Sequence, residues 1–185
     1  MRARTLLLLL LAAVVVVPGC GSGGGGETGA LPVLSGSTLP TLAADTHPVD
    51  AAGLSSDADP KADLEGRLGD WGFSHGTERV FQGESERLDR VVSRTLEFDS
   101  AEGASSYVDY LGGHPDLFYG VGSTAKRFAL GGRAGYLVDA ASCACHRAAP
   151  TLVAVLARGN RVTYLEANGG AVTDASVRRL VAQAP

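Results

Sequence analysis

Apolar and polar residues alternate along several short segments in the second half of the chain, a pattern typical of β-strands that bury one face. The clearest segment is 88–98, where Val92 and Leu96 alternate with Ser93 and Thr95. This alternation predicts a sheet with one face open to water. Further strands are predicted at residues 79–82, 126–130, 134–139, 151–158 and 160–167.

Apolar residues at helical spacing predict helices between and after these strands. Asp59 and Pro60 suit the N-cap and first turn of one helix, and Ser100 suits the N-cap of a second. Thr173 or Asp174 would cap a third helix near the end of the chain. Helices and hairpin-linked strands in this order predict an α+β fold. We expect an antiparallel sheet of about five or six strands, with about three helices packed mainly on one face.

The chain before residue 59 differs in composition from the rest. Residues 20–58 are rich in Gly, Ser, Pro and Thr and contain no aromatic residue. Such a segment cannot bury enough apolar surface to offset the entropy of ordering it. We therefore predict a disordered linker over residues 20–58 and a single folded domain over residues 59–185.

An unbroken apolar run occupies residues 6–17. Its twelve residues would reach only about 18 Å as a helix, which is too short to cross a hydrocarbon core of about 30 Å. Two arginines precede the run, and the sequence Val-Pro-Gly-Cys, ending at Cys20, closes it. A positive start, a short apolar core and a small residue before the cut are the features of a secretion signal.

The residues that end at Cys20 resemble the lipobox of bacterial lipoproteins that are processed by signal peptidase II. Val17, Gly19 and Cys20 match that motif, whereas Pro18 departs from its usual residues. The resemblance implies a signal peptide at residues 1–19 and a diacylglyceryl group on Cys20, which becomes the new N-terminus. A chain acylated in this way would be anchored to the cell membrane and face its extracytoplasmic side. An ordinary secretion signal and an uncleaved anchor stay open as alternatives.

The charge of the chain disfavours some partners. The formal net charge is −4, and removal of residues 1–19 takes away two arginines and no acids, which leaves −6. An acidic protein lacks the basic face that nucleic acids require, and it is not drawn to an anionic membrane leaflet. We therefore expect no nucleic acid, and we expect the membrane as a partner through the lipid on Cys20. The sequence does not identify a protein or small-molecule partner.

Cys143, Cys145 and His146 form a reactive cluster in a loop between two predicted strands. Thiols outside the cell tend to pair, so we predict a disulfide between Cys143 and Cys145. Two thiolates and an imidazole would also suit Cu(I) or Zn(II), although a tetrahedral zinc site needs a fourth ligand. Thiol–disulfide exchange is another alternative, but its usual motif has two residues between the cysteines. The spacing also argues against covalent haem attachment.

The remaining motifs favour binding over catalysis. Gly120 and Gly122 lack the third glycine of a dinucleotide fingerprint. Phe118 and Tyr119 are adjacent aromatic residues in a glycine-rich segment and form a candidate contact surface. The sequence predicts no catalytic residue and no cofactor.

We predict a non-enzymatic, membrane-anchored lipoprotein with a binding or envelope-associated role. Its layout resembles that of small lipoproteins of high-GC Gram-positive bacteria. The main alternative is metal binding or thiol redox chemistry through Cys143, Cys145 and His146. A weaker alternative is a carrier of an apolar ligand, which would need a large apolar cavity.

Overall fold

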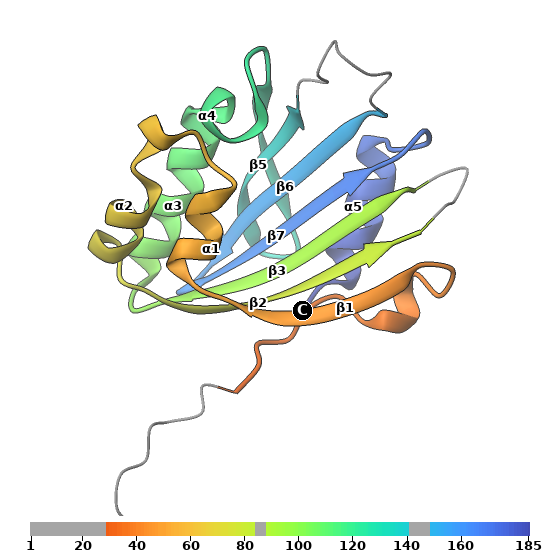
Figure 1. Ribbon diagram of the computed structural model, residues 1–185, viewed down its shortest axis with the longest axis horizontal. Coiled ribbons are helices and arrows are strands. Elements are labelled where there is room, and N and C mark those ends of the chain that lie inside the picture. The colour runs from red at the N-terminus through yellow and green to blue at the C-terminus, as the bar shows by residue number, and fades with distance from the viewer. Residues whose placement is uncertain (1–28, 84–87, 141–148) are drawn as a thin grey trace, which may run out of the picture.

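The computed structural model describes residues 29–83, 88–140 and 149–185, which form an antiparallel sheet with helices on both faces (Figure 1). The strands are β1 (Ala43–Val49), β2 (Phe73–Gln82), β3 (Arg90–Phe98), β4 (Thr124–Leu130), β5 (Arg133–Ala140), β6 (Thr151–Arg158) and β7 (Arg161–Asn168). The helices are α1 (Ala51–Ser56), α2 (Leu64–Asp70), α3 (Ala101–Gly113), α4 (Pro115–Tyr119) and α5 (Asp174–Gln183). Short 3₁₀ segments lie at Gly36–Thr38 and Pro60–Ala62. The strand order across the sheet is β1-β2-β3-β7-β6-β5-β4.

The predicted α+β class is confirmed, with seven strands among the described residues instead of about five or six. The segments predicted at 134–139, 151–158 and 160–167 correspond to β5, β6 and β7. The sequence pattern does not predict β1, which pairs with β2 at the edge of the sheet. β1 contains Pro48 and is exposed along almost its whole length, so it lacks the apolar alternation by which buried strands are recognised.

The prediction of a disordered linker as far as residue 58 is wrong for the part of that segment that the structure describes. Residues 43–49 form β1 and residues 51–56 form α1. Leu34 and Leu54 are buried, with exposed fractions of 0% and 3%. These leucines are widely spaced among small and polar residues, but both pack against surface that the later strands and helices provide. The folded domain therefore begins before residue 59.

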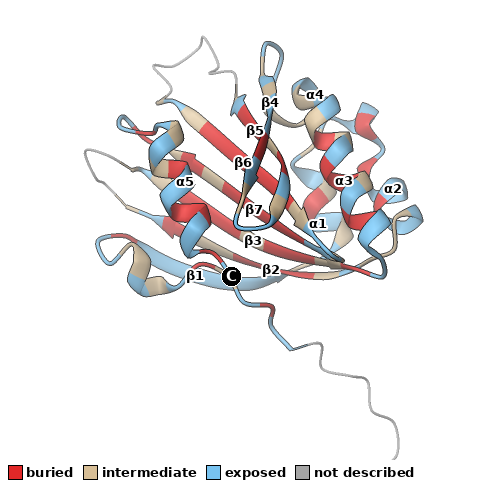
Figure 2. Cartoon of the chain, turned by 180° about the vertical axis from the view of Figure 1, so that it is seen from behind, coloured by how far each residue is buried: buried red, intermediate tan, exposed pale blue. Residues whose placement is uncertain are grey.

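Helices cover both faces of the sheet. α1, α2, α3 and α4 lie on one face, and α5 lies on the other (Figure 1, Figure 2). The core beneath α3 includes Val92 and Leu96 of β3, whereas the core beneath α5 includes Val91 of the same strand. The helices therefore pack mainly on one face, as predicted, and α5 is the exception.

The prediction that residues 88–98 leave one face open to water is wrong. Ser93 and Thr95 are only 1% and 5% exposed. The chain that leads into β1 crosses this face beside α5, so the polar side chains of β3 are covered. Polar residues on a strand therefore do not mark a solvated face when another segment of backbone supplies their partners.

Hydroxyl groups on β2 and β3 hold this crossing segment. We call Thr77, Ser93 and Thr95 the hydroxyl row. The bonds run from the N–H of Leu31 to Thr77 Oγ1 (2.8 Å), from the N–H of Leu34 to Ser93 Oγ (3.0 Å), and from the Thr95 hydroxyl to the carbonyl of Pro32 (2.6 Å). The row thus satisfies backbone groups that would otherwise be buried without partners.

The predicted N-caps of α3 and α5 are confirmed. The side chains of Ser100 and Thr173 each accept a hydrogen bond from the first turn of the helix that follows. The helix predicted from Asp59 is divided in two. Asp59 caps the 3₁₀ segment, and Asp63, with φ of 45°, separates that segment from α2. The left-handed conformation of Asp63 interrupts the helix.

Candidate functional site

A cavity of about 260 Å³ lies between the sheet and the helices α1, α3 and α4. Strands β3 and β7 form its floor, and we call it the Arg94 cleft after the arginine on that floor. The polar side chains that line it are Asp57, Arg90, Arg94, Tyr107, Tyr119, Tyr164 and Glu166. The cleft is smaller than the pockets of about 300–1,000 Å³ that hold drug-sized ligands.

The register of the sheet assembles the floor of the cleft. Glu78 of β2, Arg94 of β3 and Tyr164 of β7 are direct neighbours across the three strands. Arg94 shares its side of β3 with Val92 and Leu96, which belong to the core beneath α3. Side chains alternate along β3, so Arg94 points into the core beneath the helices. An aliphatic residue is usual at such a position.

Arg94 is held by two carboxylates and one aromatic ring. Its side chain is 12% exposed and forms an ion pair through Nε with Glu78, and its Nη2 lies 2.9 Å from Asp57 Oδ2. The guanidinium carbon lies 4.9 Å from the centre of the Tyr164 ring. Burial disfavours the charge on Arg94, but the interactions with Tyr164 and Glu78 outweigh burial and raise its pKa. Arg94 is therefore a fixed positive charge at the base of the cleft.

The second charged pair of the cleft is formed by Arg90 and Glu166. Arg90 Nη1 lies 2.6 Å from Glu166 Oε1, and the Tyr164 hydroxyl donates to Glu166 Oε2 at 3.0 Å. Each carboxylate oxygen of Glu166 thus already has one donor. Every charged side chain that lines the cleft belongs to an ion pair within the described part of the chain.

Tyr119 has a polar atom in this region that the protein does not satisfy. Its hydroxyl oxygen is buried and makes no hydrogen bond of acceptable geometry among the described residues, although it lies near the Tyr164 hydroxyl, whose own proton goes to Glu166. Burial raises the pKa of Tyr119 above its ordinary value and raises the pKa of Tyr107 to about 12. Both phenols therefore stay protonated at neutral pH. A buried hydroxyl without a partner costs folding free energy, so its position at a cavity wall requires an explanation.

A second cavity of about 280 Å³ adjoins the Arg94 cleft and shares Leu54, Asp57, Arg90 and Arg94 with it. Glu78 lines this neighbour, where His47 Nε2 lies 2.9 Å from Glu78 Oε1. Arg94 and Asp57 therefore stand between two cavities, and His47 lies within hydrogen-bond distance of Glu78 on the outer side.

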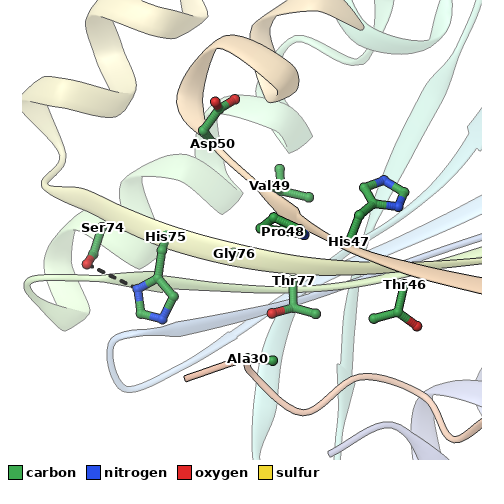
Figure 3. Close-up of a pocket in the computed structure, with 10 residues that line it drawn as sticks. All are labelled: Ala30, Thr46, His47, Pro48, Val49, Asp50, Ser74, His75, Gly76 and Thr77. Carbon is green, nitrogen blue, oxygen red and sulfur yellow. Dashed lines mark hydrogen bonds between the residues drawn. The ribbon is translucent and has the colours of Figure 1, made fainter. Parts of the chain in front are cut away.

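A larger cavity of about 380 Å³ lies at the edge formed by β1 and β2. Figure 3 shows that His47 and His75 point to opposite sides of these strands. His75 Nδ1 lies 3.2 Å from Ser74 Oγ, whereas His47 turns toward Glu78. The polar groups of this cavity do not converge. No group of three potential metal ligands occurs in residues 29–83, 88–140 and 149–185.

Residues 72–76 read Gly-Phe-Ser-His-Gly, which is the spacing of a nucleophile elbow, and our sequence analysis did not identify it. Ser74 lies in a strand that follows helix α2, whereas an elbow joins a strand to a following helix. Its hydroxyl meets the imidazole of the adjacent residue, and no carboxylate of the described chain bonds that imidazole. Within the described part of the chain, Ser74 and His75 therefore have no third member of a catalytic triad.

The sequence matches no protein-family model and no curated protein. Among solved structures, the chain is similar to the extracellular domain of PknH from Mycobacterium tuberculosis. The two share 10% sequence identity, the match covers 80% of this chain and 86% of that chain, and the TM-score is 0.48.

The structure describes only some of the site residues that the sequence analysis predicts. Phe118 and Tyr119 both line the Arg94 cleft, but their role as a contact surface stays a prediction. Cys20 lies outside the described residues, as do Cys143, Cys145 and His146. No helix of the described chain is long and apolar enough to span a membrane.

Sequence reasoning also missed the arginine at the base of the cleft. The available signal was a charged residue, Arg94, at an inward position between Val92 and Leu96. Its partners could not be identified from the sequence because they come from β2, from β7 and from the end of α1.

Proposed function

We propose that the protein is a lipid-anchored, extracytoplasmic and non-catalytic module that binds a small, uncharged, hydroxyl-rich molecule of monosaccharide size in the Arg94 cleft. The observation that carries the proposal is the buried hydroxyl of Tyr119, a residue that lines the cleft, because this hydroxyl makes no hydrogen bond of acceptable geometry within the described residues. A ligand oxygen would accept its hydrogen bond and remove the cost of leaving it unpaired.

The charges of the cleft favour an uncharged ligand. Arg94 is balanced by Glu78 and Asp57, and Arg90 is balanced by Glu166. A charged ligand would have to break one of these pairs, and an ion left unpaired in a buried site costs several kcal/mol. A hydroxyl group both donates and accepts, so it can use the remaining lone pairs of Glu166 and the donor of Tyr119 without disturbing either pair.

The walls of the cleft support the same ligand class. Aromatic rings of Tyr107, Phe118 and Tyr119 stand among the charged groups. Sugar rings present apolar C–H faces and polar hydroxyl edges, which suit a site that combines aromatic surface with bidentate polar side chains. The charged floor gives no support to a carrier of an apolar ligand, because such a ligand could not replace the water around Arg90 and Glu166.

Ligand-observed saturation-transfer NMR tests this proposal. Glucose, N-acetylglucosamine and myo-inositol serve as neutral probes, and glucuronate and glucosamine serve as charged comparators. We expect saturation transfer to at least one neutral probe, loss of the signal in Tyr119→Phe, and an unchanged signal in Tyr136→Phe, which removes a hydroxyl that bonds to Asp109 away from the cleft. Saturation transfer to the charged comparators that is as strong as transfer to the neutral probes would contradict the proposal. Binding of a neutral probe that survives Tyr119→Phe would contradict it as well.

The membrane anchor is tested separately. We expect radiolabelled palmitate to be incorporated into the chain and to be lost in Cys20→Ser. An N-terminal sequence that still begins at residue 1 would refute the anchor and leave the ligand proposal standing.

A further inference from the structure

A third region of the molecule concentrates positive charge. A cavity of about 420 Å³ on the face of the sheet that carries α5 is lined by Arg133, Arg158 and Arg161, with Pro32, Thr95 and Thr163 beside them. We call it the arginine pocket. The described residues that line it are all different from those of the Arg94 cleft, which lies on the other face.

Strand ends bring the three arginines together. Arg133 begins β5, Arg158 ends β6 and Arg161 begins β7. Arg158 and Arg161 are direct register partners on either side of a turn in which Gly159 has φ of 58°. Like charges placed opposite each other in an antiparallel pair are destabilising, so the free protein bears a cost at this hairpin.

Only part of this charge is neutralised within the described chain. Arg161 Nη2 lies 2.9 Å from Glu97 Oε2. Arg133 donates to the carbonyl oxygens of Val181 (2.8 Å) and Ala184 (3.2 Å), to the main-chain oxygen of Pro185 (3.0 Å), and to Thr163 Oγ1 (3.3 Å). Arg158 has no hydrogen bond or ion pair within the described residues.

The electrostatics of Arg133 agree with an excess of positive charge. Burial and then the charge of Arg158 lower the pKa of Arg133. Among the described residues, no carboxylate side chain lines the arginine pocket, although the chain as a whole is acidic, with a formal net charge of −4. The charged side chains that line the pocket are therefore opposite in sign to the net charge of the protein.

We propose that the arginine pocket binds a phosphate group. Arg158 supplies a free guanidinium fork, Arg161 supplies the donors that Glu97 does not use, and Arg133 adds charge from the side of α5. A phosphate group has several oxygens that can accept hydrogen bonds from more than one guanidinium group. The planar guanidinium group of arginine can donate two parallel hydrogen bonds to two of these oxygens, so arginine suits phosphate binding.

The position of the pocket allows two sources of phosphate. Pro32 lines the pocket and lies twelve residues after Cys20, a stretch of chain that reaches at most about 43 Å when fully extended. Figure 1 shows the N-terminal segment beside the C-terminal end of the chain, at this side of the sheet. If Cys20 carries lipid, a phospholipid headgroup and a free phosphate are both within reach.

The experiment uses the full chain in micelles of a detergent that contains no phosphate and measures binding of radiolabelled inorganic phosphate by equilibrium dialysis. We expect saturable binding that falls by about tenfold or more in Arg158→Gln, because one charge-assisted contact is lost. Arg179→Gln is the matched control, since it removes the same charge from an exposed position on α5 and should bind as the parent does.

Three results would overturn the proposal: no phosphate binding by the parent chain, equal binding by Arg158→Gln, or equal displacement of phosphate by acetate at the same ionic strength. A second arm moves the chain from these micelles into nanodiscs that contain anionic phosphatidylglycerol. Weaker phosphate binding in these discs, seen with the parent and not with Arg158→Gln, identifies the lipid headgroup as the occupant. Unchanged binding identifies free phosphate. Neither arm depends on the Arg94 cleft, so failure of one proposal leaves the other intact.

Discussion

Arg94 and Glu78 face each other across β3 and β2 and form an ion pair in which the side chains are only 12% and 8% exposed. Glu78 also lies 2.9 Å from His47, so one carboxylate serves two basic groups. The pair links the Arg94 cleft to the neighbouring cavity.

Removing one partner of this pair should destabilise the fold strongly. Arg94→Met leaves the Glu78 carboxylate buried without its main counter-charge, and we expect a loss of about 3–5 kcal/mol in the free energy of unfolding. The double variant Arg94→Met/Glu78→Gln should recover a large part of that loss. Urea denaturation of the parent and the variants measures both effects as a double-mutant cycle.

The control for this cycle is the ion pair of Lys126 and Asp174, whose side chains are 62% and 48% exposed. We expect Lys126→Met to change stability by less than about 1 kcal/mol. A loss in Lys126→Met as large as that in Arg94→Met would show that burial is not what makes the Arg94 pair important.

Tyr119→Phe should stabilise the ligand-free protein. The substitution removes a buried hydroxyl that has no partner and keeps the ring, so we expect a gain of about 1 kcal/mol in the free energy of unfolding. Tyr136→Phe, which removes a hydroxyl bonded to Asp109, should give no such gain. Thermal unfolding of both variants without ligand measures the difference, and a lower midpoint for Tyr119→Phe would mean that its hydroxyl is satisfied in solution.

Stability should fall steeply in alkaline solution. Burial raises the pKa of Tyr107 from an ordinary value of 10 to about 12. The phenol ionises more readily in the unfolded chain, so its contribution is fully present below pH 10 and is lost as the pH rises from 10 through 12. For this group alone the free energy of unfolding should fall by about 1.4 kcal/mol per pH unit in that range.

Tyr107→Phe tests this slope. The variant keeps the ring in its buried position and removes the ionisable group, so its unfolding free energy should depend less on pH above 10. Burial also raises the pKa of Tyr164 and Tyr119, so part of the slope should remain. Parallel pH profiles for the variant and the parent would rule out Tyr107 as a contributor.

Close packing of α3 against the end of α2 depends on a glycine. A Cβ at Gly103 would lie 1.9 Å from the carbonyl oxygen of Trp71, which is backbone and cannot rotate away. Gly103→Ala should therefore shift α3 and cost about 1–3 kcal/mol. Gly113→Ala, at the other end of the same helix with no atom within 4 Å, should leave stability unchanged or raise it by up to about 1 kcal/mol.

Local chemistry explains which parts of the fold could be predicted from the sequence. Ser100 and Thr173 cap their helices through bonds to their own first turns, and β6 and β7 show their apolar pattern within single segments. β1 could not be predicted because an edge strand takes its order from β2 and not from its own side chains. The same reason applies to Arg94, whose role depends on Glu78, Asp57 and the Tyr164 ring.

The hydroxyl row should hold the N-terminal segment on the sheet. Ser93→Ala leaves the N–H of Leu34 without its acceptor, and Thr95→Val leaves the carbonyl of Pro32 without its donor. Each unpaired group costs about 1–3 kcal/mol. Because the lost bonds join residues 31–34 to the sheet, this segment should detach before the domain unfolds.

Hydrogen exchange at Leu34 and limited proteolysis before β1 measure that detachment. We expect faster exchange and earlier cleavage in Ser93→Ala and Thr95→Val, with the rest of the sheet still protected. Ser105→Ala, on the exposed side of α3, removes a similar hydroxyl without touching the segment and should behave as the parent does. Uniform loss of protection across the sheet in Ser93→Ala would instead mean that residues 29–42 unfold only together with the domain.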